Sequence, residues 1–144
     1  MFRGVFDGNG KTITGLYINR PVENNQGLFG WVCTDSMAVV KNLNIMNADI
    51  TGINYVGGVA GRLDADCIIQ NCRITGSVRG NDYVGGVAGS AREDSIIQGC
   101  SSTGSVSGRT YVGGIAGQVA LSGTIEDCSN YSSVAGTGNY VGGI

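Results

Sequence analysis

The chain has 144 residues, with 26 glycines, one proline, no histidine and a formal net charge of −2. Lysine and arginine are scattered singly, so the sequence lacks the basic stripe that nucleic acid or an anionic membrane surface requires. No apolar run approaches the roughly 20 residues of a membrane span. We therefore expect no nucleic-acid partner and no membrane insertion. Glycine and β-branched residues are poor helix formers, and their abundance predicts short strands joined by tight turns.

The first informative stretch is residues 6–18, FDGNGKTITGLYI, which suggests a phosphate loop at Gly10-Lys11-Thr12. That motif requires glycine five residues before Gly10, where the chain has Val5, and a helix must follow it. Residues 7–10 begin like a calcium loop but lack the further oxygen ligands and the bidentate glutamate of an EF-hand. A tight turn whose glycines supply positive φ explains the segment, so we expect no cofactor there.

One six-residue pattern occurs five times, at residues 13–18, 40–45, 69–74, 97–102 and 125–130. Its first position is always β-branched, its second is mostly polar and its fourth is apolar, as in a strand that bends between two inward residues. The third position contains only residue types that tolerate the left-handed backbone conformation. This predicts a structural corner in every coil, at Gly15, Asn42, Asn71, Gly99 and Asp127.

The five cysteines divide into two groups. Cys72, Cys100 and Cys128 occupy the fourth position of the bent strand and should stack as a core cysteine ladder, because free cysteine is among the most buried residue types. The distance between neighbouring rungs permits a disulfide between two of these cysteines. A metal site is disfavoured, since the chain has no histidine and no Cys-x-x-Cys pair. Cys33 and Cys67 lie outside the ladder.

Two further ladders define the repeat. The stretch Tyr-Val-Gly-Gly begins at Tyr55 and returns after 28, 28 and 29 residues, and it is preceded by an apolar ladder that starts at Ile50. Three short strands per 27–29 residues predict an all-β, right-handed parallel β-helix (β-solenoid) of about five coils. An antiparallel sandwich would not explain the fixed period. We expect residues 1–144 to form one β-solenoid repeat domain, which is a fragment of a larger protein.

The recurring YVGGVAG, with GLFG at residues 27–30 and the leading FDGNGKTITGL, resembles the GLUG-motif repeats of bacterial cell-surface and secreted proteins. These include adhesin-like proteins and the amino-terminal regions of IgA-specific metallopeptidases. The resemblance implies a β-solenoid with an extracellular or cell-surface location. The His-Glu-x-x-His motif of those peptidases is absent from this chain, so the resemblance does not imply peptidase activity here.

Two sets of residues are candidates for binding. Four tyrosines form a column that could stack on sugar rings or stabilise the solenoid by stacking on one another. Four acids after the glycine-rich segments could bind calcium or serve a glycan-active enzyme, although a solvated loop of mixed charge explains them too. An ice-binding face requires a regular column of threonines. The candidate column does not provide one, because it contains Thr75, Thr103 and then Tyr131. The tyrosines are Tyr55, Tyr83, Tyr111 and Tyr140, and the acids are Asp64, Asp66, Glu93 and Asp94.

The sequence contains no catalytic constellation, so we expect a non-catalytic structural or adhesive repeat module of a cell-surface or secreted protein. Its expected partners are host or matrix glycans or proteins. A carbohydrate-binding surface module is the alternative, and a glycan-active β-helix enzyme is a further one. Residues 140–144 end inside a repeat motif, so we also expect end-to-end self-association of an uncapped solenoid.

Overall fold

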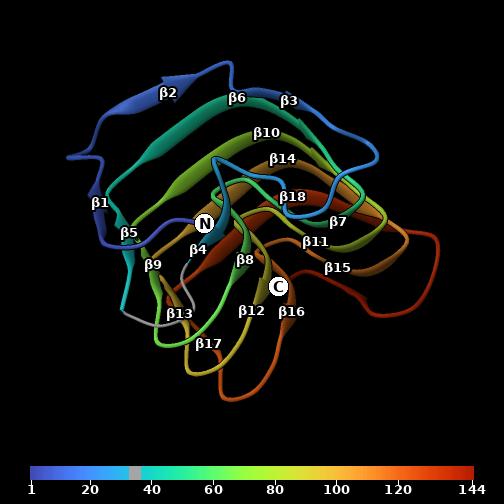
Figure 1. Cartoon of the computed structure of the whole chain (residues 1–144). Helices are drawn as coiled ribbons and strands as arrows, with labels where there is room; N and C mark the ends of the chain where they lie inside the picture. The colour runs from blue at the N-terminus through green and yellow to red at the C-terminus, as the bar shows by residue number, and fades with distance from the viewer. Residues whose placement is uncertain (33–36) are drawn as a thin grey trace.

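The computed structural model describes residues 1–32 and 37–144, and these form a parallel β-solenoid of about five turns without any helix (Figure 1). This confirms the predicted all-β solenoid. Every strand pairing is parallel, between strands about one coil apart in the sequence. The described residues therefore offer no helix long and apolar enough to cross a bilayer. The right-handed sense stays a prediction.

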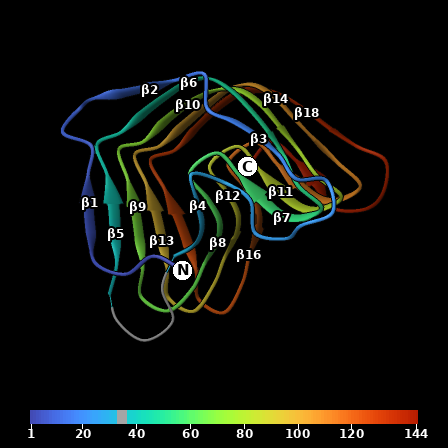
Figure 2. The same ribbon diagram turned by 45° about the horizontal axis from the view of Figure 1, so that its top comes forward.

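The strands stack into four sheets, which we number in the order that each coil visits them (Figure 2). Sheet 1 contains β1 (Val5–Asp7), β5 (Val39–Lys41), β9 (Ile68–Gln70), β13 (Ile96–Gln98) and β17 (Thr124–Glu126). Sheet 2 contains β2 (Thr12–Thr14), β3 (Tyr17–Asn19), β6 (Asn44–Thr51), β10 (Arg73–Arg79), β14 (Ser101–Gly108) and β18 (Ser129–Gly136). Sheet 3 contains β7 (Asn54–Gly57), β11 (Asp82–Gly85), β15 (Thr110–Gly113) and β19 (Val141–Gly142). Sheet 4 contains β4 (Phe29–Val32), β8 (Ala60–Leu63), β12 (Ala88–Ala91) and β16 (Ala116–Val119).

The prediction of three strands per coil is wrong, because the structure has four. The glycine-rich stretch alone forms two strands in a coil, such as β7 and β8, joined by a turn at Gly58-Val59. A Cβ atom at Gly58 would lie 2.5 Å from the carbonyl oxygen of Gly86 on the next coil. The pair of glycines therefore lets the turns of successive coils stack closely while the chain changes direction.

The opening segment is a turn. The backbone N–H of Asn9 donates to Oδ1 of Asp7 at 2.9 Å, and the N–H of Lys11 donates to the carbonyl of Gly8 at 2.8 Å. Asn9 and Gly10 have positive φ, 48° and 70°. The bond from Asn9 also lowers the pKa of Asp7, with the amide of Asn42 contributing next. The segment is followed by β2 and not by a helix, which excludes a phosphate loop.

The corner between sheets 1 and 2 has left-handed backbone geometry in four coils, with φ values of 55° at Asn42, 52° at Asn71, 61° at Gly99 and 50° at Asp127. The prediction of a corner at Gly15 is wrong: its φ is 71°, but it lies between β2 and β3, within sheet 2. The register explains the error, because Ile13 pairs with Ile45 and not with Val40. Corner amides bond to the next coil: the N–H of Asn71 donates to the carbonyl of Gln98 at 2.9 Å, and that of Gly99 to Glu126 at 3.0 Å. The corner thus turns the chain without losing inter-coil hydrogen bonds.

Aliphatic ladders fill the core, because the parallel register places equivalent inward residues above one another. One inward column of sheet 2 changes character along the axis. Ile45 and Ile74 are followed by Ser102 and then Asn130. Ser102 is buried, and its hydroxyl forms a 2.8 Å hydrogen bond with that of Ser132. The core is therefore apolar in the middle coils and partly polar towards the last coil. Its largest fully buried side chains are Ile45, Ile50, Leu63, Ile69, Ile74, Ile97 and Ile115.

Candidate functional site

The four tyrosines of the predicted ligand face form one continuous stack. Their ring centroids are 4.7, 4.8 and 4.5 Å apart from Tyr55 to Tyr140, with interplanar angles of 2°, 13° and 11°. A pyranose binds an aromatic ring by its face, and the faces inside this stack are covered by neighbouring rings. Burial, together with the neighbouring rings of Tyr55 and Tyr111, raises the pKa of Tyr83. The geometry favours a structural role for the stack.

The same tyrosines have an unusual backbone, with φ of 57°, 59°, 55° and 61°. Positive φ is rare for a bulky residue. Sheets 3 and 4 approach closely at these residues: a Cβ atom at Gly89 would lie 2.5 Å from the backbone nitrogen of Val56 and 2.6 Å from the carbonyl carbon of Tyr55. Glycine in sheet 4 thus accommodates the strained tyrosine backbone in sheet 3.

The first ring of the stack contacts a cluster that the sequence did not predict. The guanidinium carbon of Arg62 lies 4.8 Å from the ring centroid of Trp31 and 5.8 Å from that of Tyr55. Nε of Arg62 is 2.7 Å from Oδ2 of Asp64, and the indole N–H of Trp31 donates to the same oxygen at 3.0 Å. Asp64 is only 3% exposed. It is a buried structural carboxylate and not a residue of a solvated loop.

The other three predicted calcium candidates lie in exposed turns. Asp66, Glu93 and Asp94 have φ of 56°, 55° and 58°, so each belongs to a left-handed turn of the loop between sheets 4 and 1. Across the described ranges, no three acidic or cysteine side chains gather as metal ligands would. These three acids are therefore turn residues, and they do not gather with Asp64 into one site.

The cysteine ladder occupies the inward side of the corner. Cys72 and Cys100 are 1% exposed, Cys128 is partly exposed, and all three are free thiols. The backbone N–H of Cys100 donates to Sγ of Cys128 at 3.3 Å. A hydrogen bond from the Cys100 thiol lowers the pKa of Cys128 to about 7, and the pKa of Cys100 is raised by the same partnership. Cys67 is buried and disulfide-bonded, and Cys33 lies outside the described residues.

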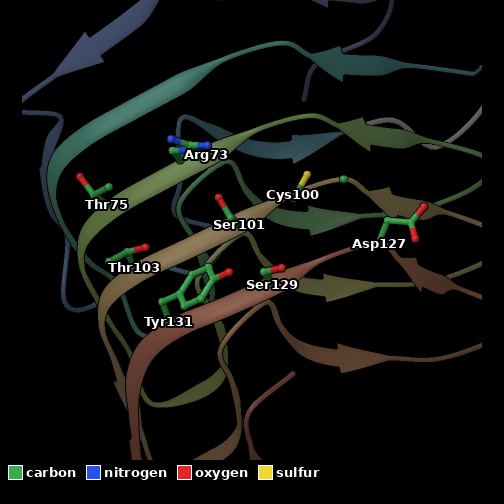
Figure 3. Close-up of a pocket in the computed structure, with 9 residues that line it drawn as sticks. Arg73, Thr75, Cys100, Ser101, Thr103, Asp127, Ser129 and Tyr131 are labelled. Carbon is green, nitrogen blue, oxygen red and sulfur yellow. The ribbon is translucent and has the colours of Figure 1, made fainter.

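A depression with a volume of about 480 Å³ lies on the outer face of sheet 2, across β10, β14 and β18 (Figure 3). Small residues line the base of the depression, and larger residues lie at its edges. Gly99, Ser101 and Thr103 lie on the middle coil, with Arg73 on the coil before and Asp127 and Tyr131 on the coil after. No sequence pattern indicated this site, although Tyr131 interrupts the column of Thr75 and Thr103.

Comparison with known proteins is consistent with this architecture. The family model of the GLUG motif matches residues 52–79 and 80–107, and each match covers one coil from β7 or β11 onward. Halomucin from Haloquadratum walsbyi is 40% identical over 77 residues, which are 54% of this chain and 1% of halomucin. The crystal structure of a proposed immunoglobulin A1 protease from Bacteroides ovatus aligns with a TM-score of 0.76 and 28% identity, over 92% of this chain and 43% of that one. The chain spans less than half the length of either protein. It is therefore a β-solenoid that contains two consecutive GLUG-motif repeats.

Proposed function

We propose that this chain is a non-catalytic structural and adhesive module of a secreted or cell-surface protein. The observation that carries the proposal is the in-register stacking of coils, which repeats outward positions at strand spacing on a rigid scaffold. Outward ladders reinforce it: Nε2 of Gln70 donates to Oε1 of Gln98 at 3.2 Å, and the tyrosines stack over four coils. Solenoids of this kind present extended surfaces suited to binding.

The relatives support an extracellular setting. The Bacteroides ovatus protein is named as a proposed immunoglobulin A1 protease, and the match covers 43% of it. The match to halomucin covers 1% of that protein. A domain that resembles parts of two such differently named proteins suits a spacer or adhesive role better than a catalytic one. The proposed partners are glycans or proteins of a host or matrix surface.

The arrangement of acids favours binding over glycan cleavage. Glycosidases use two carboxyl groups roughly 5–10 Å apart on either side of the scissile bond. Asp64 is held by Arg62 and Trp31, while the depression on sheet 2 is lined by a single carboxylate, Asp127. A ligand held there would meet no acid and base pair.

Two measurements test the proposal. Antibodies raised against this chain should label intact cells that express the full-length protein, or detect it in the medium; labelling only after lysis would overturn the surface assignment. Beads coated with the chain should adhere to surfaces coated with glycans or matrix proteins more than beads coated with the urea-unfolded chain. New reducing ends released from those glycans would contradict a non-catalytic role.

A further inference from the structure

We propose that the depression on sheet 2 is a saccharide-binding site in which a pyranose ring stacks on Tyr131 and its hydroxyl groups bond to Ser101, Ser129 and Asp127. This inference deepens the adhesive function proposed above and rests on it. Nothing in the sequence repeat assigns a ligand to these residues. The argument depends on shape, on the freedom of one ring and on the unused polar groups around it.

The shape follows from the register of three outward columns. Arg73, Ser101 and Ser129 lie on consecutive strands, as do Thr75, Thr103 and Tyr131. The corner column adds Gly99, which has no side chain, before Asp127. Because strands are about 4.8 Å apart, the coils on either side of β14 are roughly 10 Å apart, which leaves room for one sugar ring above the small residues of β14. The volume of about 480 Å³ falls within the usual range for ligand pockets.

Tyr131 is the aromatic side chain in this region whose ring is available. It is 72% exposed, and among the described residues it forms no ring contact, in contrast to the tyrosine stack. An exposed ring beside a hollow offers its face to the apolar side of a pyranose. In Figure 3 the ring lies next to Thr103 and Ser129, on the strand that borders the depression.

The backbone beneath Tyr131 is fixed by its two inward neighbours. Oδ1 of Asn130 accepts the backbone N–H of Ser132 at 2.8 Å, and the hydroxyl of Ser132 bonds to that of Ser102 at 2.8 Å. Tyr131 is therefore held between two anchored residues while its own side chain points outward. A platform fixed before binding loses less conformational entropy when the ligand arrives.

The polar groups around the ring are not used within the protein. In the described part of the chain, Arg73 and Asp127 form no ion pair, and the hydroxyls of Ser101, Thr103 and Ser129 form no hydrogen bond. Thr75 differs, since its hydroxyl accepts the N–H of Asn47 at 3.1 Å. The free set comprises one cation, one anion and three hydroxyls beside one aromatic face.

This combination selects the class of ligand. A phosphate or sulfate group would meet the repulsion of Asp127 and a single arginine, whereas an apolar peptide would meet almost no apolar wall. A saccharide has one apolar face and many hydroxyl groups that both donate and accept, which matches a ring with mixed donors and acceptors around it. Asp127 accepts from sugar hydroxyls, and Arg73 donates to a ring oxygen, a hydroxyl or a uronate.

The test is titration calorimetry of the purified chain against three saccharide probes: oligomers of neutral hexoses, of N-acetylhexosamines and of uronic acids. Tyr131→Ala should weaken binding of the best probe at least about tenfold, Asp127→Asn should weaken it severalfold, and Tyr131→Phe should retain it. Tyr17→Ala is the matched control, because Tyr17 lies on β3 of the same sheet, outside the depression, and is 67% exposed. It should bind like the unmodified chain.

Two results would overturn the proposal. If none of the three probes binds to the unmodified chain, the depression is not a saccharide site, while bead adhesion to protein-coated surfaces would leave the adhesive function standing. If a probe binds but Tyr17→Ala weakens binding as much as Tyr131→Ala, the ligand lies elsewhere on the sheet. Circular dichroism of each variant establishes that a lost affinity is not lost folding.

Discussion

The indole N–H of Trp31 on β4 donates to the carboxylate of Asp64, which follows β8, and Arg62 forms an ion pair with the same oxygen. These contacts join the first coil to the second, and the guanidinium of Arg62 lies over the ring of Tyr55 at the end of the tyrosine stack. Asp64→Ala removes the shared acceptor and leaves two polar groups poorly satisfied. We expect the free energy of unfolding to fall by about 1–3 kcal/mol, measured by urea denaturation.

The control for that variant is Asp49→Ala, which breaks an exposed ion pair with Arg79. Exposed pairs contribute about 0–1 kcal/mol, so this change should have little effect on stability. Equal losses from the two variants would show that the Trp31–Asp64 contact has no special importance.

Gly89→Ala should strongly reduce the stability of the folded chain, although it adds only a methyl group. The added Cβ would meet backbone atoms of Tyr55 and Val56 at 2.5–2.6 Å, and backbone in a stacked sheet cannot move aside cheaply. We expect a loss of about 1–3 kcal/mol or more in urea denaturation. Gly143→Ala is the control, since nothing lies within 4 Å of its Cβ position. A neutral Gly89→Ala would contradict the close contact between sheets 3 and 4.

The corner can be tested at Asn71, where φ is 52°. Asn71→Val places a β-branched residue in the left-handed region and should cost about 1–2 kcal/mol of stability. Asn71→Gly keeps that conformation accessible and should change stability much less. Thermal unfolding of the two variants separates conformation from the loss of the amide, because both lack the amide side chain. Identical melting temperatures would refute the conformational explanation.

Cys128 should be the reactive member of the cysteine ladder. Its pKa is lowered to about 7 and its side chain is partly exposed, whereas Cys72 and Cys100 are buried. The thiolate is the reactive form, so alkylation by iodoacetamide should be slow at pH 5 and rise with a midpoint near pH 7. Peptide mass spectrometry identifies the modified residue, and Cys128→Ser should abolish its signal. A midpoint near pH 9, the ordinary value for a thiol, would contradict the lowered pKa.

The coil and its corners were predictable because they depend on local residue type and on a fixed period. Asn, Asp and Gly at the third position of the bent strand indicated positive φ, and Asn71 and Asp127 have it. The strand count was not predictable in the same way. Gly57 and Gly58 were consistent with one strand or with two, and the choice depends on how closely neighbouring coils pack.

The tyrosine backbone and the depression depend on relations between coils, which a linear pattern does not display. Nothing in the type of residue 55 indicates positive φ, since tyrosine rarely adopts it. The depression becomes visible only when Arg73, Ser101 and Ser129 are aligned by register beside Gly99 and Tyr131. Comparing side-chain size along each outward column is the signal that would have found it.

The inward column that changes from Ile74 to Ser102 and Asn130 gives the solenoid a direction. Coils of nearly equal length look exchangeable, but each is matched to the chemistry of the coil on either side. Moving the coil of Asn130 between those of Ile45 and Ile74 would place an amide among methyl groups without the hydroxyl of Ser102 nearby. Duplicating the coils that contain Ile45 and Ile74 should therefore lengthen the solenoid stably, whereas duplicating the coil of Asn130 among them should not. The sequence thus determines the order of the coils as well as their shape.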